Sequence, residues 1–221
     1  MKKKIVIAAV VFLAILVCML TAFINFLNQI EEDSLTIITD TSVYKGRESF
    51  LEEEYAEYRS LLLTFPENTM DSMNIEKFYY ERDLASLDIG YKILLTYTLD
   101  EDDFEEEKQR LEDISITYEG ETRNILYTEE GFHYPAYVAV FSMGTYEYAL
   151  IDEENHRIIC VFTQISGLDK DVLTEEYMPI AEELPQECKD NFDMYYFKMG
   201  EAYGVGIYDI PEVDKASKNQ K

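Results

Sequence analysis

The sequence has few basic residues for its size. Against 45 Asp and Glu it contains 19 Lys and Arg, which gives a formal net charge of -26. A chain of this charge repels nucleic acids and anionic lipid headgroups, so nucleic-acid binding is excluded as a function. The same charge favours solubility and a diffuse attraction for cations, but it says little about the fold.

Histidine is almost absent, which limits metal chemistry. The two histidines are His133, in the stretch from Gly131 to Pro135, and His156, which ends a turn. Neither belongs to a paired metal-ligand motif such as His-Glu-x-x-His. A metal flanked by these histidines and nearby acids is one interpretation, but two polar surface histidines are the favoured one.

Cysteine is also scarce, with Cys18 in an apolar run and Cys160 and Cys188 in the polar part of the chain. Cys160 and Cys188 could form one disulfide in an oxidising compartment, and the sequence leaves this open. Cys160 with His156 could form a thiol nucleophile. Packing of Cys160 in a strand, where cysteine behaves as a small hydrophobic residue, is favoured instead.

Established catalytic motifs are missing as well. There is no Gly-x-Ser-x-Gly elbow, phosphate-binding loop or dinucleotide fingerprint. Carboxylates are so abundant that a pair at hydrolase spacing arises by chance and carries no information. The sequence therefore nominates no catalytic, cofactor-binding or metal-binding residue, implies no cofactor, and leans away from an enzyme.

A long apolar run at the N-terminus is the clearest positive feature. Residues 5–24 carry no charge and follow Lys2, Lys3 and Lys4. About 20 apolar residues cross a bilayer, and preceding lysines favour a cytoplasmic N-terminus. The run predicts a single-pass signal-anchor in the cell membrane, with the C-terminal domain extracytoplasmic. A signal peptide cleaved near Ala22 and a lipoprotein acylated at Cys18 are less favoured alternatives.

Tyrosine is unusually frequent, with 18 copies beside 12 Phe and no Trp. Such residues suit half-buried sheet faces, and they also line surfaces that bind sugars or peptides. The first interpretation is favoured because the tyrosines lie within strand-like runs.

Several segments show the alternation of a β-strand. Strands are predicted at 74–80 and 90–99, and a run at 35–39 is either a strand or a stalk. Three further strands are predicted at 136–141, 146–151 and 157–165. The short links between these three, such as Asp152-Glu153-Glu154-Asn155, require antiparallel pairing.

Helix signals lie between the strands. Ser49 and Glu52 form a capping box for a helix that runs to Phe65 and ends at Pro66. A second helix is predicted to begin after Asp100, the N-cap, with Glu106 and Arg110 paired one turn apart. A calcium loop beginning at Asp100 is disfavoured, since its sixth and twelfth positions are Glu105 and Leu111 rather than Gly and Glu.

The remaining sequence is less patterned. Residues 173–192 are predicted to be helical in part, with short strands at 195–197 and 204–208. Together the segments predict an α+β fold: an N-terminal transmembrane helix followed by one domain whose antiparallel sheet is covered by helices on one face. The expected divisions are 1–30, lysine cluster and transmembrane anchor; 31–45, stalk or first strand; 46–210, extracytoplasmic α+β domain; and 211–221, disordered tail.

The lysines at 2–4 before the apolar run, and the acidic, Tyr-rich stretch from Tyr146 to Ile165, resemble those of small single-anchor ectodomain proteins of Gram-positive bacteria. The resemblance implies a bacterial cell-envelope setting and transfers no site residues. The function expected from the sequence is a membrane-anchored interaction or structural domain, with an envelope protein or the cell wall as partner. The alternatives are a membrane-tethered carboxylate hydrolase and a surface cation-binding protein.

Overall fold

A computed structural model of the chain describes most of the region between residues 35 and 164 and several shorter segments. The described residues are 17–24, 35–47, 61–83, 90–142, 144–164, 172–180 and 194–198.

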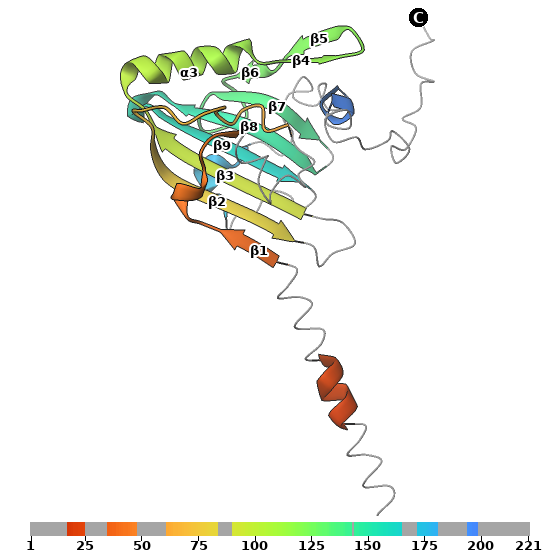
Figure 1. Cartoon of the computed structure of the whole chain (residues 1–221). Helices are drawn as coiled ribbons and strands as arrows, with labels where there is room; N and C mark the ends of the chain where they lie inside the picture. Colours follow the sequence, from red (N-terminus) through yellow and green to blue (C-terminus); the bar gives the residue numbers. More distant parts are fainter. Residues whose placement is uncertain are drawn as a thin grey trace, which may run out of the picture.

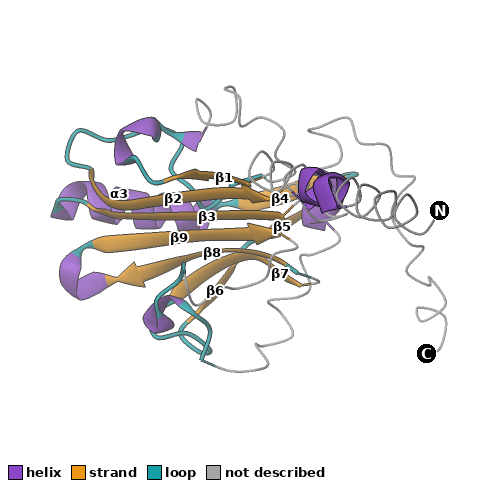
Figure 2. Cartoon of the chain, turned by 90° about the horizontal axis from the view of Figure 1, so that it is seen from below, coloured by secondary structure: helices purple, strands orange, loops and turns teal. Residues whose placement is uncertain are grey.

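Within these residues the architecture is dominated by one antiparallel sheet in which seven strands have the order β1-β2-β3-β9-β8-β7-β6 (Figures 1 and 2). The central strands β3, β9 and β8 pair along their whole length, and neighbours along the chain are joined mostly by short connections. The bounds of the strands are β1 Leu35–Ile38, β2 Asn74–Asp83, β3 Gly90–Thr98, β6 Leu126–Thr128, β7 Ala136–Ser142, β8 Thr145–Asp152 and β9 Arg157–Gln164.

Outside the sheet, the described part of the domain contains one long helix, a short helix at 194–198, one small hairpin and three single turns. Helix α3 spans Glu101–Asp113, and the hairpin pairs β4, Ser115–Tyr118, with β5, Glu121–Asn124. Asp100 caps the helix by accepting a hydrogen bond from the backbone N–H of Asp103, as its position predicts. The 3-10 turns are η1 Thr41–Val43, η2 Glu153–Asn155 and η3 Glu175–Tyr177.

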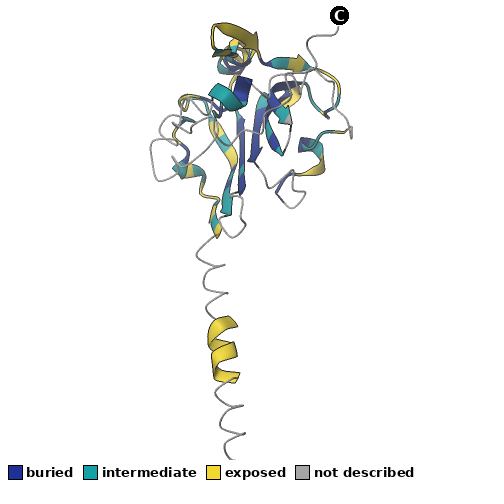
Figure 3. Cartoon of the chain, turned by 90° about the vertical axis from the view of Figure 1, so that its right-hand side faces the viewer, coloured by how far each residue is buried: buried dark blue, intermediate teal, exposed yellow. Residues whose placement is uncertain are grey.

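Both faces of the sheet are apolar, because most side chains of β3, β8 and β9 are buried whichever way they point (Figure 3). On the first face, Tyr97 and Cys160 belong to a cluster completed by Tyr44, Phe65 and Phe104. On the second face, the residues of the sheet pack beneath a smaller set of covering side chains, namely Phe132, Leu173 and Tyr177. Two apolar faces must both be covered to exclude water.

The predicted arrangement, with helices covering one face of the sheet, is therefore wrong. The described fold is mostly antiparallel sheet with few helices, and irregular segments do much of the covering. Residues 61–67 lie over the first face, and residues 172–178 lie over the second. The spacing of apolar residues up to Phe65 suits a helix, so the sequence predicted a helix at 61–65 where the structure has an irregular turn.

The predicted transmembrane helix is also contradicted. Among the described residues, no helix is long and apolar enough to cross a membrane. The described part of the apolar run is a helix at 17–24, which is exposed (Figure 3). This finding overturns the signal-anchor and the single-pass membrane localisation with a cytoplasmic N-terminus and an extracytoplasmic domain.

Most predicted strands are confirmed. The predicted strands at 74–80, 90–99, 136–141, 146–151 and 157–165 correspond to β2, β3, β7, β8 and β9, and the run at 35–39 contains strand β1. The last three form the expected antiparallel meander.

Several helix predictions are wrong or untested. Residues 61–65 form an irregular turn rather than the end of a helix, and Leu62 has a φ of 45°. Residues 194–198 are helical, not extended. The rest of the predicted first helix, residues 48–60, lies outside the described residues, as do 181–193, the predicted strand at 204–208 and the predicted disordered tail.

Candidate functional site

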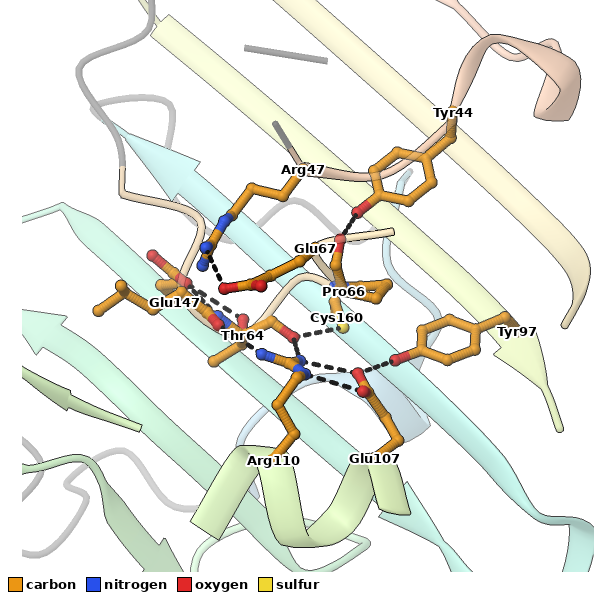
Figure 4. Close-up of polar contacts among 11 residues, drawn as sticks. Tyr44, Arg47, Thr64, Pro66, Glu67, Tyr97, Glu107, Arg110, Glu147 and Cys160 are labelled. Atoms are coloured by element: carbon orange, nitrogen blue, oxygen red, sulfur yellow. Dashed lines mark hydrogen bonds and ion pairs between the residues drawn. The ribbon is translucent and has the colours of Figure 1, made fainter. Parts of the chain in front are cut away.

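The largest concentration of buried ionisable groups lies on the first face of the sheet, beneath residues 61–67 (Figure 4). We call it the buried polar cluster. Strands β3, β8 and β9, helix α3, the covering segment and the helix at 194–198 each supply at least one member. The cluster consists of Thr64, Tyr97, Glu107, Arg110, Glu147, Cys160 and Tyr195.

An ion pair on helix α3 forms one half of the cluster. Glu107 is 1% exposed and accepts two hydrogen bonds from Arg110, at 2.8 Å from Nε and 2.7 Å from Nη2. The hydroxyl of Tyr97 donates a third bond, of 2.9 Å, to Glu107 Oε1. Burial acts to lower the pKa of Arg110, but the hydrogen bonds from its guanidinium to Glu107 raise it overall. The guanidinium is therefore a permanent cation here.

The same guanidinium of Arg110 also binds the covering segment. Its Nη1 donates to the carbonyl of Leu63 at 3.1 Å, and its Nη2 donates to the carbonyl of Thr64 at 2.9 Å. These carbonyls belong to no helix or strand, so the side chain replaces the bonds that regular structure supplies.

Glu147 forms the second half of the cluster. It points from β8 to the same face and is fully buried. Its Oε1 accepts bonds from the backbone N–H of Thr64, at 2.8 Å, and from the Thr64 hydroxyl, at 3.2 Å. Its Oε2 accepts a bond from the hydroxyl of Tyr195, which in turn accepts from the N–H of Leu61 at 3.1 Å. Burial raises the pKa of Glu147, although bonds from Tyr195 and Thr64 act to lower it.

Cys160 lies between the two halves and is a free thiol. Its Sγ donates to the carbonyl of Thr64 at 3.3 Å, and it is fully buried in the sheet. Burial raises the pKa of the thiol, so the nucleophilic thiolate is disfavoured. The packing interpretation of Cys160 is confirmed. Cys188, its possible disulfide partner, lies outside the described residues.

Hydrogen bonds also join the end of the covering segment to residues 44–47. Pro66 provides a carbonyl that accepts from the hydroxyl of Tyr44 and from the backbone N–H of Arg47, both at 2.8 Å. Arg47 also pairs with Glu67 at 2.7 Å. Residues 44–47 and 61–67 therefore form one bonded layer over the sheet.

The structure keeps the two histidines apart from this cluster. His133 is exposed, whereas His156 has a left-handed backbone and stacks on Phe104 with ring centroids 5.1 Å apart. Among the residues that the structure describes, no group of three or more His, Cys, Asp or Glu could hold a metal ion.

The sequence analysis missed Glu107 and Glu147, and it paired Arg110 with Glu106. Glu107 falls between Phe104 and Leu111 on the inward side of α3, whereas Glu106 is exposed. Glu147 alternates with apolar residues on the inward side of β8. An acid at a position where the pattern expects a buried apolar residue could have identified both glutamates. The sequence contains so many acids that these two did not stand out.

A surface pocket of about 220 Å³ lies between α3 and the β6–β7 edge of the sheet. Its acids Glu105 and Glu153 are solvent-exposed, and both pair with Lys108, at 2.8 and 3.0 Å. The pocket is shallow and polar, and its lining includes Glu105, Lys108, Glu112, Tyr127, Tyr137 and Glu153.

Comparison with known proteins gives no guide to the chain, since no protein-family model, curated protein or solved structure matches it. Its function must be argued from the geometry.

Proposed function

We propose that the chain is a non-catalytic interaction domain whose partner is a positively charged protein. The observation that carries the proposal is the solvent-facing side of α3. Its acidic side chains are exposed, while Lys108 is the basic residue among them and is already paired with acids. We call this acidic side the α3 surface, and it consists of Glu101, Asp102, Glu105, Glu106, Glu112 and Asp113.

A surface of one charge sign on a rigid element attracts partners of the opposite sign and orients their approach. Helix α3 is rigidly held, because Phe104, Glu107 and Leu111 bury its other side against the sheet. A basic protein is therefore the partner that this surface suits best.

The buried acids support the interaction domain over the carboxylate hydrolase. A hydrolase requires a carboxyl group that faces substrate, with at least one such group in an apolar pocket. Glu147 is buried and its pKa is raised, yet both of its oxygens are bonded to Thr64 and Tyr195. Glu107 is likewise bonded to Arg110 and Tyr97. These bonds assign both acids to holding the covering segment.

Binding of fluorescein-labelled oligolysine to the full chain, followed by anisotropy near physiological salt, tests the proposal. We compare the triple variant Glu101→Gln, Glu106→Gln, Glu112→Gln with a control triple, Glu76→Gln, Glu119→Gln, Glu175→Gln. All six acids are exposed, and the two variants have the same net charge. We expect about a tenfold loss of affinity for the α3 variant and about twofold or less for the control.

Equal losses in the two triple variants would show that only net charge matters and would overturn the assignment to α3. Turnover of a peptide or cell-wall substrate by the purified chain would overturn the non-catalytic role.

A further inference from the structure

Strand β1 forms one edge of the seven-stranded sheet, at the opposite side from β6 (Figure 1). It pairs with β2 through the register Leu35↔Asp83 to Ile38↔Tyr80, and no described strand pairs with its other side. Its backbone N–H and C=O groups on that side are positioned to accept another strand.

The side chains of β1 also favour the addition of another strand at this edge. Leu35 and Ile37 are 46% and 49% exposed and share one face by the alternation of a strand. Ile38 points the other way and packs against the core of the first face. Within the described residues, the edge thus combines a strand backbone that pairs on one side only with two exposed apolar side chains.

Natural edge strands usually carry protection against pairing, such as Lys, Pro, a bulge or very short length. Strand β1 is itself short, with the four residues Leu-Thr-Ile-Ile, but it contains no Lys or Pro, and its register with β2 has no bulge. Asp40, two residues further on, still has an extended backbone. The opposite edge strand β6 has three residues and is followed at once by Glu129 and Glu130. The two edges are therefore not equivalent.

We propose that the β1 edge binds an extended segment of a partner protein, in which alternating apolar residues are flanked by Lys or Arg. The partner strand adds to the sheet through backbone hydrogen bonds, and its apolar side chains cover Leu35 and Ile37. The basic flanks follow from charge complementarity. The exposed Asp40 lies just beyond the last residue of β1, and the whole chain carries a net charge of -26.

Charge also argues against a second copy of the chain as the occupant. Antiparallel pairing of two β1 strands places Leu35 of one copy opposite Ile38 of the other. Asp40 of each copy then approaches the end of β1 where Asp83 of the other copy lies. Each chain carries a net charge of -26, which adds a general repulsion. The inference is independent of the α3 surface, which lies near the β6 edge.

The test uses the full chain and a labelled probe peptide of alternating valine and threonine with lysines at both ends. One control peptide has proline in place of the central valine, and another has glutamates in place of the lysines. We expect the first peptide to bind at least about tenfold more tightly than either control, because proline cannot continue a ladder. Hydrogen exchange of residues 35–38 should slow when the peptide is bound.

Two protein variants locate the binding. Ile37→Lys places a charge on the exposed side of β1, whereas Ile180→Lys makes the same change at a residue that is 61% exposed elsewhere. We expect about a tenfold loss of affinity for Ile37→Lys and less than about twofold for Ile180→Lys. Equal binding of the proline peptide, or no effect of Ile37→Lys, would overturn the inference. A concentration-dependent dimer abolished by Ile37→Lys would instead assign the edge to a second copy. None of these results depends on the α3 variants.

Discussion

Glu107 and Glu147 come from different elements, yet both act on the same short backbone segment. Glu107 orients Arg110, which binds the carbonyls of Leu63 and Thr64, and Glu147 accepts from the N–H of Thr64. Irregular backbone is costly to bury unless each polar group finds a partner. At the residue scale, Glu107 and Glu147 are thus buried because the backbone N–H and C=O groups around residue 64 require hydrogen-bond partners.

Removal of Arg110 should be strongly destabilising. In Arg110→Met the carboxylate of Glu107 remains buried without its cation, and the carbonyls of Leu63 and Thr64 each lose one donor. We expect a loss of about 3–5 kcal/mol in the free energy of unfolding, measured by urea denaturation. The matched control is Arg123→Met, because Arg123 forms an exposed pair with Glu121 at 3.7 Å. The control should lose no more than about 1 kcal/mol; similar losses in both variants would contradict the role of the cluster.

The raised pKa of Glu147 makes a prediction about pH. Because the native pKa exceeds the ordinary value of 4.5, the native state binds more protons than the unfolded state. Stability from this group is full below the unfolded pKa and is lost as pH rises through the native pKa. Glu147→Gln lacks this loss. The free energy of unfolding of the variant minus that of the wild type should therefore increase as pH rises from about 4.5.

Chemical denaturation at a series of pH values measures that difference. Glu129→Gln, at an exposed position, controls for the loss of one charge. A difference for Glu147→Gln that decreases with pH would mean that hydrogen bonding to the carboxylate outweighs burial.

At the scale of elements, the fold depends on two irregular segments that lie against each other. The backbone N–H of Arg47 donates to the carbonyl of Pro66, and Gly46 lies directly against residues 67 and 68. Gly46 has a φ of 120°, which side chains rarely adopt, and a Cβ there would meet the backbone oxygen of Glu67 and lie 2.7 Å from Cα of Asn68. The close approach of the segments requires glycine at this position.

Gly46→Ala should consequently lower the free energy of unfolding by more than a glycine substitution whose only effect is backbone strain. We expect a loss of at least about 2 kcal/mol in the free energy of unfolding. The control is Gly120→Ala, where φ is 83° but no atom lies within 4 Å of the added Cβ. It should lose about 1–2 kcal/mol or less. Equal losses would mean that the two segments separate readily.

The strands were predictable because their residues alternate or form short apolar runs between turns, which is a local property. Helix α3 was predictable from its cap and its acidic first turn. Residues 61–65 were not, since their spacing of apolar residues suits a helix although tertiary contacts hold them in a turn. The helical preference of these residues is opposed by the hydrogen bonds that Arg110 and Glu147 form with their backbone, and those tertiary hydrogen bonds decide the conformation.

At the scale of the whole molecule, the net charge of -26 repels itself in the compact state. Salt screens this repulsion, with a Debye length of about 10 Å at 0.1 M ionic strength. We expect the midpoint of thermal unfolding to rise by several degrees as NaCl increases from about 20 to about 500 mM. Sorbitol at equal osmolality is the control for solvent exclusion. A falling midpoint with salt would indicate that attractive ion pairs, such as Lys92 with Glu81, dominate instead.

The sequence by itself determined the acidic character, most of the strands and the cap of α3. These follow from composition and from contacts between residues close in the chain. Only the tertiary structure decided which of the many acids are buried, that both sheet faces are covered, and that β1 is an edge strand among the described strands. Those properties arise from residues such as Thr64, Glu147 and Tyr195, which are distant in sequence and meet only when the sheet and its covering segments are assembled.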